Sequence, residues 1–86
     1  MLRLRGQYRV APNKRLTIIA DTHHLPKGTL AEDIDALTQA CTQNAGACEV
    51  EVTTPHGLMR GTLTMKSATL LRRRTFEGSF AYLPRA

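Results

Sequence analysis

The sequence predicts a single α+β domain over residues 1–86, in which an antiparallel β-sheet packs on one α-helix. Only residues 29–44 carry apolar side chains at helical spacing, whereas several other segments alternate apolar and polar residues as strands do. A chain of 86 residues with 42% hydrophobic residues can form one small core. The predicted order is strand, strand, helix and three strands, and the C-terminal segment can supply a sixth, short strand.

The first ten residues alternate strictly between apolar and polar side chains, which is typical of a half-buried strand. The outward positions are Arg3, Arg5, Gln7 and Arg9, so the outer face of this strand is basic. Turn-forming residues at 11–14 lead to a second strand over 15–21. We expect these two strands to pair antiparallel.

The helix is predicted over residues 29–44 because its apolar side chains line one face. That stripe consists of Leu30, Ile34, Leu37 and Cys41. Thr29 and Glu32 have the spacing of a capping box, in which each side chain bonds a backbone N–H near the helix start. Gly46 is expected to take a left-handed conformation where the helix ends.

Beyond the helix, alternation predicts a third strand over 48–53 and a fourth over 58–66, joined by a turn at 54–57. A fifth strand is predicted over 69–76. Its three consecutive arginines, 72–74, fall on both faces, and this suits the edge of a sheet or a loop. Glu77 and Gly78 then predict a turn into a short sixth strand at 79–83.

Two cysteines are too few for a disulfide scaffold, and their spacing matches no metal or redox motif. Cys41 lies on the apolar helix stripe, and Cys48 has the apolar parity of the next strand. We expect two free, buried thiols. The short connection at 42–47 would also let them approach each other, so the sequence leaves their pairing open.

The net charge of +5 conceals a segregation along the chain. Residues 1–28 and 53–86 each carry six basic side chains and one acid, whereas residues 29–52 carry five acids and no Lys or Arg. We therefore expect a basic sheet face and edge that attract phosphates or an acidic protein. The candidate binding residues are Arg3, Arg5, Arg9, Arg60, Lys66, Arg72, Arg73 and Arg74.

Two functions fit this charge distribution. In the first, a small basic binding protein contacts nucleic acid through its arginine-rich face or edge. In the second, a phage- or plasmid-type inhibitor or regulator binds a host protein through the basic face or the acidic helix, whose surface acids are Glu32, Asp33 and Asp35. Glu49 and Glu51 share the open face, so the strand order decides whether they neutralise the arginines.

One short string resembles a catalytic motif. Asp21 and His23, at the end of a predicted strand, resemble the first metal-binding motif of calcineurin-type metallophosphoesterases, which implies a two-metal site that activates water. The Gly-Asp and Gly-Asn-His motifs of that family do not occur in this sequence. We instead expect Asp21 to cap local backbone N–H groups. We predict no catalytic residue, metal site or cofactor, and therefore a protein that is not an enzyme.

The apolar runs are too short to span a bilayer, and arginines interrupt the N-terminal segment. We expect a cytoplasmic protein without a membrane partner. A sheet covered by a single helix leaves apolar area and a strand edge exposed. We therefore also expect a homodimer.

Overall fold

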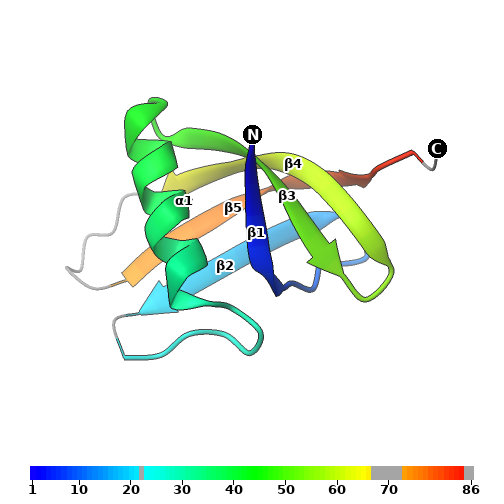
Figure 1. Ribbon diagram of the computed structural model, residues 1–86, viewed down its shortest axis with the longest axis horizontal. Helices are drawn as coiled ribbons and strands as arrows, with labels where there is room; N and C mark the ends of the chain where they lie inside the picture. Colours follow the sequence, from blue (N-terminus) through cyan, green and yellow to red (C-terminus); the bar gives the residue numbers. More distant parts are fainter. Residues whose placement is uncertain (22, 67–72, 85–86) are drawn as a thin grey trace.

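The computed structural model describes residues 1–21, 23–66 and 73–84 (Figure 1). These residues form one sheet and one helix, which confirms the α+β class and the order ββαβββ. The elements are β1 (Leu2–Gln7), β2 (Arg15–Asp21), α1 (Ala31–Gln43), β3 (Ala47–Thr54), β4 (Gly57–Lys66) and β5 (Arg73–Tyr82).

The strand order in the sheet is β1-β3-β4-β5-β2. All neighbours are antiparallel except β1 and β3, which are parallel. The prediction that the first two strands pair with each other is therefore wrong, because β1 and β2 are the two edges. The edge position expected for the fifth strand is also wrong, because β5 pairs with β4 on one side and with β2 on the other. Beyond the end of β1 the chain still follows β3, since the N–H of Tyr8 donates to the carbonyl of Thr53. Alternation of side chains predicts a strand but not its partner.

The sheet curls, so the two edge strands approach one another. Tyr8, just after β1, lines the same cavity as Leu16 and Ile18 of β2. Helix α1 packs on β1, β3 and β4 and covers one face of the sheet (Figure 1). The core lies between them and contains Leu4, Tyr8, Leu16, Ile18, Ala20, Ile34, Leu37, Cys41, Cys48, Val50, Val52, Met59, Leu63, Phe76 and Phe80.

The helix begins at Ala31, later than predicted, and its N-cap is Leu30, which remains 39% exposed. No side chain of the described residues caps the helix start, so the predicted capping box of Thr29 and Glu32 is wrong. At the other end, Gly46 has φ +95° and its N–H donates to the carbonyl of Cys41. The predicted left-handed glycine is confirmed.

Strand β5 runs without a break through Glu77 and Gly78, where a turn was predicted. The predicted sixth strand is therefore the end of β5, while residues 69–72 lie outside the described residues. The glycine has another cause: a Cβ at position 78 would collide with the carbonyl oxygen of Thr62 in the adjacent β4. A glycine within a strand can mark a close approach of two backbones.

Both cysteines are free and buried, as predicted. Burial raises the pKa of each thiol. Asp21 also behaves as expected, because its carboxylate accepts the N–H of His23 at 3.4 Å. Within the described residues, no helix is long and apolar enough to cross a membrane.

Candidate nucleic-acid interface

A buried carboxylate in the first turn of α1 holds β1 in place. Asp33 is only 4% exposed, and its oxygens accept the N–H groups of Arg5 (2.9 and 3.1 Å) and Gly6 (2.8 Å). The pairing of β1 with β3 shifts register between Arg3 and Gln7, so these N–H groups belong to an irregular part of the strand. Asp33 therefore accepts backbone N–H groups at the edge of β1 that does not pair with β3. Because Asp33 is buried, the prediction that it belongs to an exposed acidic binding surface is wrong.

Tyr8 completes this arrangement. Its hydroxyl donates to Asp33 Oδ2 at 2.6 Å, and its ring is 3% exposed. Burial, followed by the hydrogen bond to Asp33 and the negative charge of that carboxylate, raises the pKa of Tyr8 far above its usual range. Asp33 thereby fixes the wall of the cavity between β1 and β2.

The open face of the sheet carries acids between its arginines. Because β3 lies between β1 and β4, Glu51 is opposite Arg3 on one side and opposite Arg60 on the other. Arg3 Nε lies 2.9 Å from Glu51 Oε2, and Glu51 is 4% exposed although Arg3 reaches solvent. The strand order therefore answers the question left open by the sequence, since Glu51 neutralises part of this face.

Other predicted cations are also beside carboxylates. Lys66 Nζ lies 3.3 Å from Glu77 Oε1 on the neighbouring strand. Arg74 is opposite the buried Ala20, and its Nη1 is 3.9 Å from Asp35 of α1, so this arginine lies on the helix side of the sheet. We call the group Arg3, Glu51, Arg60, Lys66 and Glu77 the charged sheet face.

The remaining predicted residues that the structure describes lie in different parts of it. Arg5 is exposed beside the Asp33 contact, and Arg73 is exposed at the start of β5, whereas Arg72 lies outside the described residues. Arg9 lies beyond the end of β1, outside the strand ladder that holds Arg3 and Arg60. The structure thus does not bring the predicted residues together in one patch.

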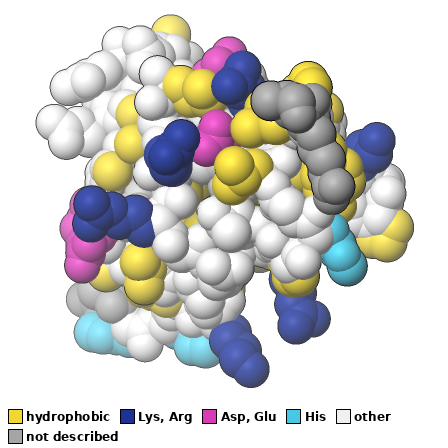
Figure 2. Space-filling view, turned by 45° about the vertical axis from the view of Figure 1, so that its right-hand side comes forward, with side chains coloured by type: hydrophobic (Ala, Val, Ile, Leu, Met, Phe, Trp, Pro, Cys, Tyr) yellow, Lys and Arg dark blue, Asp and Glu magenta, His cyan; other side chains and the backbone are white. Residues whose placement is uncertain are grey.

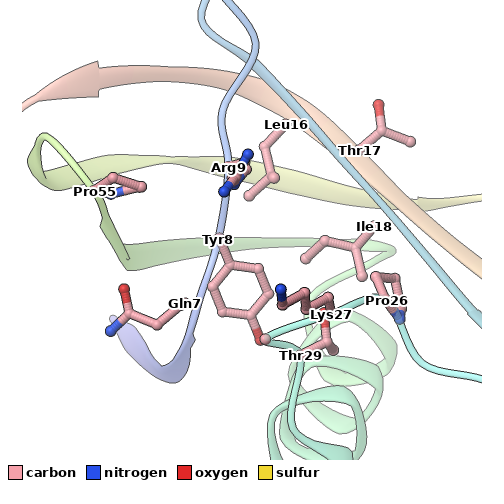
Figure 3. A pocket seen from close by; sticks show the side chains of 11 residues that line it. Gln7, Tyr8, Arg9, Leu16, Thr17, Ile18, Pro26, Lys27, Thr29 and Pro55 are labelled. Carbon is pink, nitrogen blue, oxygen red and sulfur yellow. The ribbon is translucent and has the colours of Figure 1, made fainter.

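Arg9 instead borders a cavity of about 710 Å³ between the end of β1, strand β2 and residues 26–29. Leu16 and Ile18 point toward Tyr8 across this cavity, while Arg9 and Lys27 are the cations that line it (Figure 3). A shallower hollow adjoins it, shares Arg9, and is lined by Arg15 as well. None of the described residues lining either hollow is acidic. We call these two hollows, with Arg9, Arg15 and Lys27, the Arg9 groove.

On the face of the molecule drawn in Figure 2, some cations lie beside acidic side chains and others do not. Dark blue Lys and Arg side chains in the upper and left parts of Figure 2 lie next to magenta acidic side chains, whereas those along the lower edge do not. Arg15 and Lys27 are both exposed, and neither is in an ion pair with another described residue; Arg15 Nη1 lies 3.2 Å from the hydroxyl oxygen of Ser79. These cations keep their charge available to an anion.

A third hollow lies on another side of Arg9. It is lined by Arg9, Pro55, His56 and Tyr82, among others, and Pro55 also lines the main cavity. Tyr82 is 47% exposed, so its ring is open to contact. The few aromatics of the sequence thus divide into buried core rings and one exposed ring near Arg9.

Sequence reasoning missed Arg15 and Lys27. Arg15 begins a strand and Lys27 lies in a loop, and only the curl of the sheet brings both near Arg9. A signal was present in the count of basic groups within residues 1–28, but not in their spacing. Comparison with known proteins found no match among family models, curated proteins or solved structures.

Proposed function

We propose that this protein binds nucleic acid through the Arg9 groove. One observation carries the proposal: Arg9, Arg15 and Lys27 surround a groove that has no acidic lining residue among the described residues. On the charged sheet face, by contrast, Glu51 and Glu77 lie beside the cations. A phosphate backbone gains most where the cations are not already neutralised.

The chemistry of these side chains suits phosphate. A guanidinium group presents a planar fork of donors that binds phosphate oxygens in pairs, and a lysine adds a point charge. Binding of this kind releases counterions, so its affinity falls steeply as salt rises. Among the described residues no helix lines the groove, because α1 begins at Ala31, after the lining residues 26–29, and its first turn is acidic. The proposal is therefore contact with the backbone rather than reading of a duplex sequence.

The test is a fluorescence-anisotropy titration of single- and double-stranded DNA and RNA at two salt concentrations. We expect binding that weakens steeply with salt. The triple variant Arg9→Ala, Arg15→Ala, Lys27→Ala should lose about a hundredfold in affinity, since each of the three contacts to a charged group contributes about 1 kcal/mol or more.

The control is a second triple variant with the same change of charge. It replaces Arg60, Lys66 and Arg74 by alanine, and each of these residues lies opposite or beside a carboxylate. We expect it to lose less than about threefold. A flat titration of the wild-type protein at low salt would contradict the proposal.

A second candidate function, protein binding, is favoured by the outer edge of β2. Along an antiparallel pair, residues whose backbone groups bond to the neighbouring strand alternate with residues whose backbone groups point away from it. Phe80 N–H donates to the carbonyl of Lys14, so Lys14 is one of the residues that bond to β5. The backbone groups of Thr17 and Ile19 therefore point away from β5. Ile19 is also 48% exposed. Such an edge can accept a strand from another protein or from a second copy of this chain.

The acidic helix supports protein binding less. Of the predicted acidic surface, Asp33 is buried and Asp35 lies near Arg74. Among the ion pairs of the described residues, none includes Glu32. The two candidate functions differ in their outcomes. Protein binding predicts no nucleic-acid affinity at low salt and one saturable protein partner in a pull-down.

A further inference from the structure

We infer that the Arg9 groove takes single-stranded rather than duplex nucleic acid, with a base in the main cavity and phosphates on Arg9 and Lys27. The inference rests on the proposed function and narrows its substrate. It depends on the walls of the groove, which are apolar, and not on its charge alone.

The main cavity has an apolar lining beneath its cations. Tyr8, Leu16, Ile18 and Pro26 line it, and the first three are core residues of the curled sheet (Figure 3). Its volume of about 710 Å³ lies in the range of pockets that hold small organic ligands. A duplex presents its phosphates outward and stacks its bases inside, so it would leave this lining uncovered. An unstacked nucleotide can place its base there and its phosphate at the rim.

A second surface for a base lies across Arg9. The hollow formed with Pro55, His56 and Tyr82 shares both Arg9 and Pro55 with neighbouring hollows. The ring of Tyr82 is 47% exposed, and exposed aromatic rings are the usual platforms on which single-stranded bases stack. Arg9 thus separates two hollows that can each accept an apolar face.

This order of surfaces matches the chemistry of a single strand. Successive bases alternate with phosphates along the chain, and here a cation stands between two surfaces suited to bases. The buried hydroxyl of Tyr8 is already occupied by Asp33, so it is not free for a ligand, and Tyr8 reaches the cavity with only a small part of its surface, since it is 3% exposed. Nothing in this arrangement reads a particular base, and we expect little sequence preference.

The experiment compares three fluorescent probes of equal length, about 12 nucleotides, which is within the site size of known single-strand binders. They are a thymine single strand, a single strand of the same charge with abasic sugars, and a duplex. We expect the thymine strand to bind at least about tenfold tighter than the abasic strand, because stacking of a base contributes about 1–3 kcal/mol.

Variants of one exposed residue sharpen the test. Tyr82→Ala should weaken binding of the thymine strand by about fivefold and leave the abasic strand unchanged, while Tyr82→Phe should retain the affinity. Equal binding of all three probes, or tighter binding of the duplex, would overturn this inference and leave the proposed function standing. Absence of binding to every probe at low salt would overturn both.

Discussion

Two basic regions of this molecule contain the same kinds of side chain in different surroundings. On the charged sheet face, Arg3 lies 2.9 Å from Glu51 and Lys66 lies 3.3 Å from Glu77. In the Arg9 groove, the described lining residues include cations but no acid. The comparison shows that a neighbouring carboxylate, more than the number of cations in a segment, decides which basic surface is available to a ligand.

The two regions also differ in how they are held. The sheet face is a regular ladder of neighbouring strands, so its charges follow from register. The groove depends on the curl of the sheet and on the contact between Asp33 and the end of β1. A substitution at this contact should therefore alter the shape of the groove, whereas a substitution on the charged sheet face should affect only the neighbouring side chains.

The largest expected effect comes from Asp33→Asn. An amide keeps one acceptor oxygen where the carboxylate receives the N–H groups of Arg5 and Gly6 and the hydroxyl of Tyr8. We expect the free energy of unfolding to fall by about 3 kcal/mol, measured by urea denaturation, because buried donors lose their partner. Asp35→Asn is the matched control on the exposed side of α1, and it should change stability by less than about 0.5 kcal/mol. Equal effects of the two substitutions would show that Asp33 does not hold β1.

Tyr8→Phe should have the next largest effect. Loss of the hydroxyl that donates to Asp33 should lower the free energy of unfolding by about 2 kcal/mol at pH 7. Tyr82→Phe is the control, since Tyr82 is 47% exposed and removal of its hydroxyl should have little effect on stability.

Alkaline pH provides a separate test of Tyr8. Its pKa is raised in the folded protein, so the folded state keeps the phenol protonated at a pH where the unfolded chain releases the proton. The free energy of unfolding should therefore decrease as the pH rises above about 10. The raised pKa values of Cys41 and Cys48 act with the same sign from about pH 9. In Tyr8→Phe, the part of the decrease above pH 10 should be smaller; an unchanged pH profile would contradict the buried contact.

The sequence predicts the elements well and their neighbours poorly. The range of β2 matches its prediction, and the buried positions within the first ten residues, such as Leu4 in β1 and Tyr8 just after it, follow the alternating pattern. Strand pairing depends on contacts between distant residues, and local patterns do not encode them, so β1 was assigned the wrong neighbour. Gly78 was interpreted as a turn residue because a close backbone approach and a turn both require glycine.

The candidate site shows the same limit more strongly. Arg9 was among the predicted binding residues, but its companions Arg15 and Lys27 come from a strand and a loop that meet only in the curled sheet. Asp33 was assigned to an acidic surface because it lies among other acids in the sequence. Its burial depends on the irregular part of β1 at Arg5 and Gly6, which no periodic pattern reveals.

A smaller effect is expected from Glu51→Gln. This substitution removes the negative charge that lies between Arg3 and Arg60, and it should free both arginines to attract phosphate. We expect nucleic-acid affinity to increase by about threefold at low salt, measured by anisotropy. Thr62→Gln, an exposed change elsewhere on β4, is the control. A decrease in affinity would contradict the view that Glu51 neutralises this face.

The most direct test of the central contrast is the slope of log affinity against log salt for a single-stranded probe. Each phosphate contact contributes about −0.7 to this slope. The groove variant, with Arg9, Arg15 and Lys27 replaced by alanine, should lose about 2 from the magnitude of the slope, while the variant of Arg60, Lys66 and Arg74 should keep nearly the wild-type value. Equal losses in the two variants, or a larger loss in the second, would contradict the assignment of the phosphate contacts to the Arg9 groove.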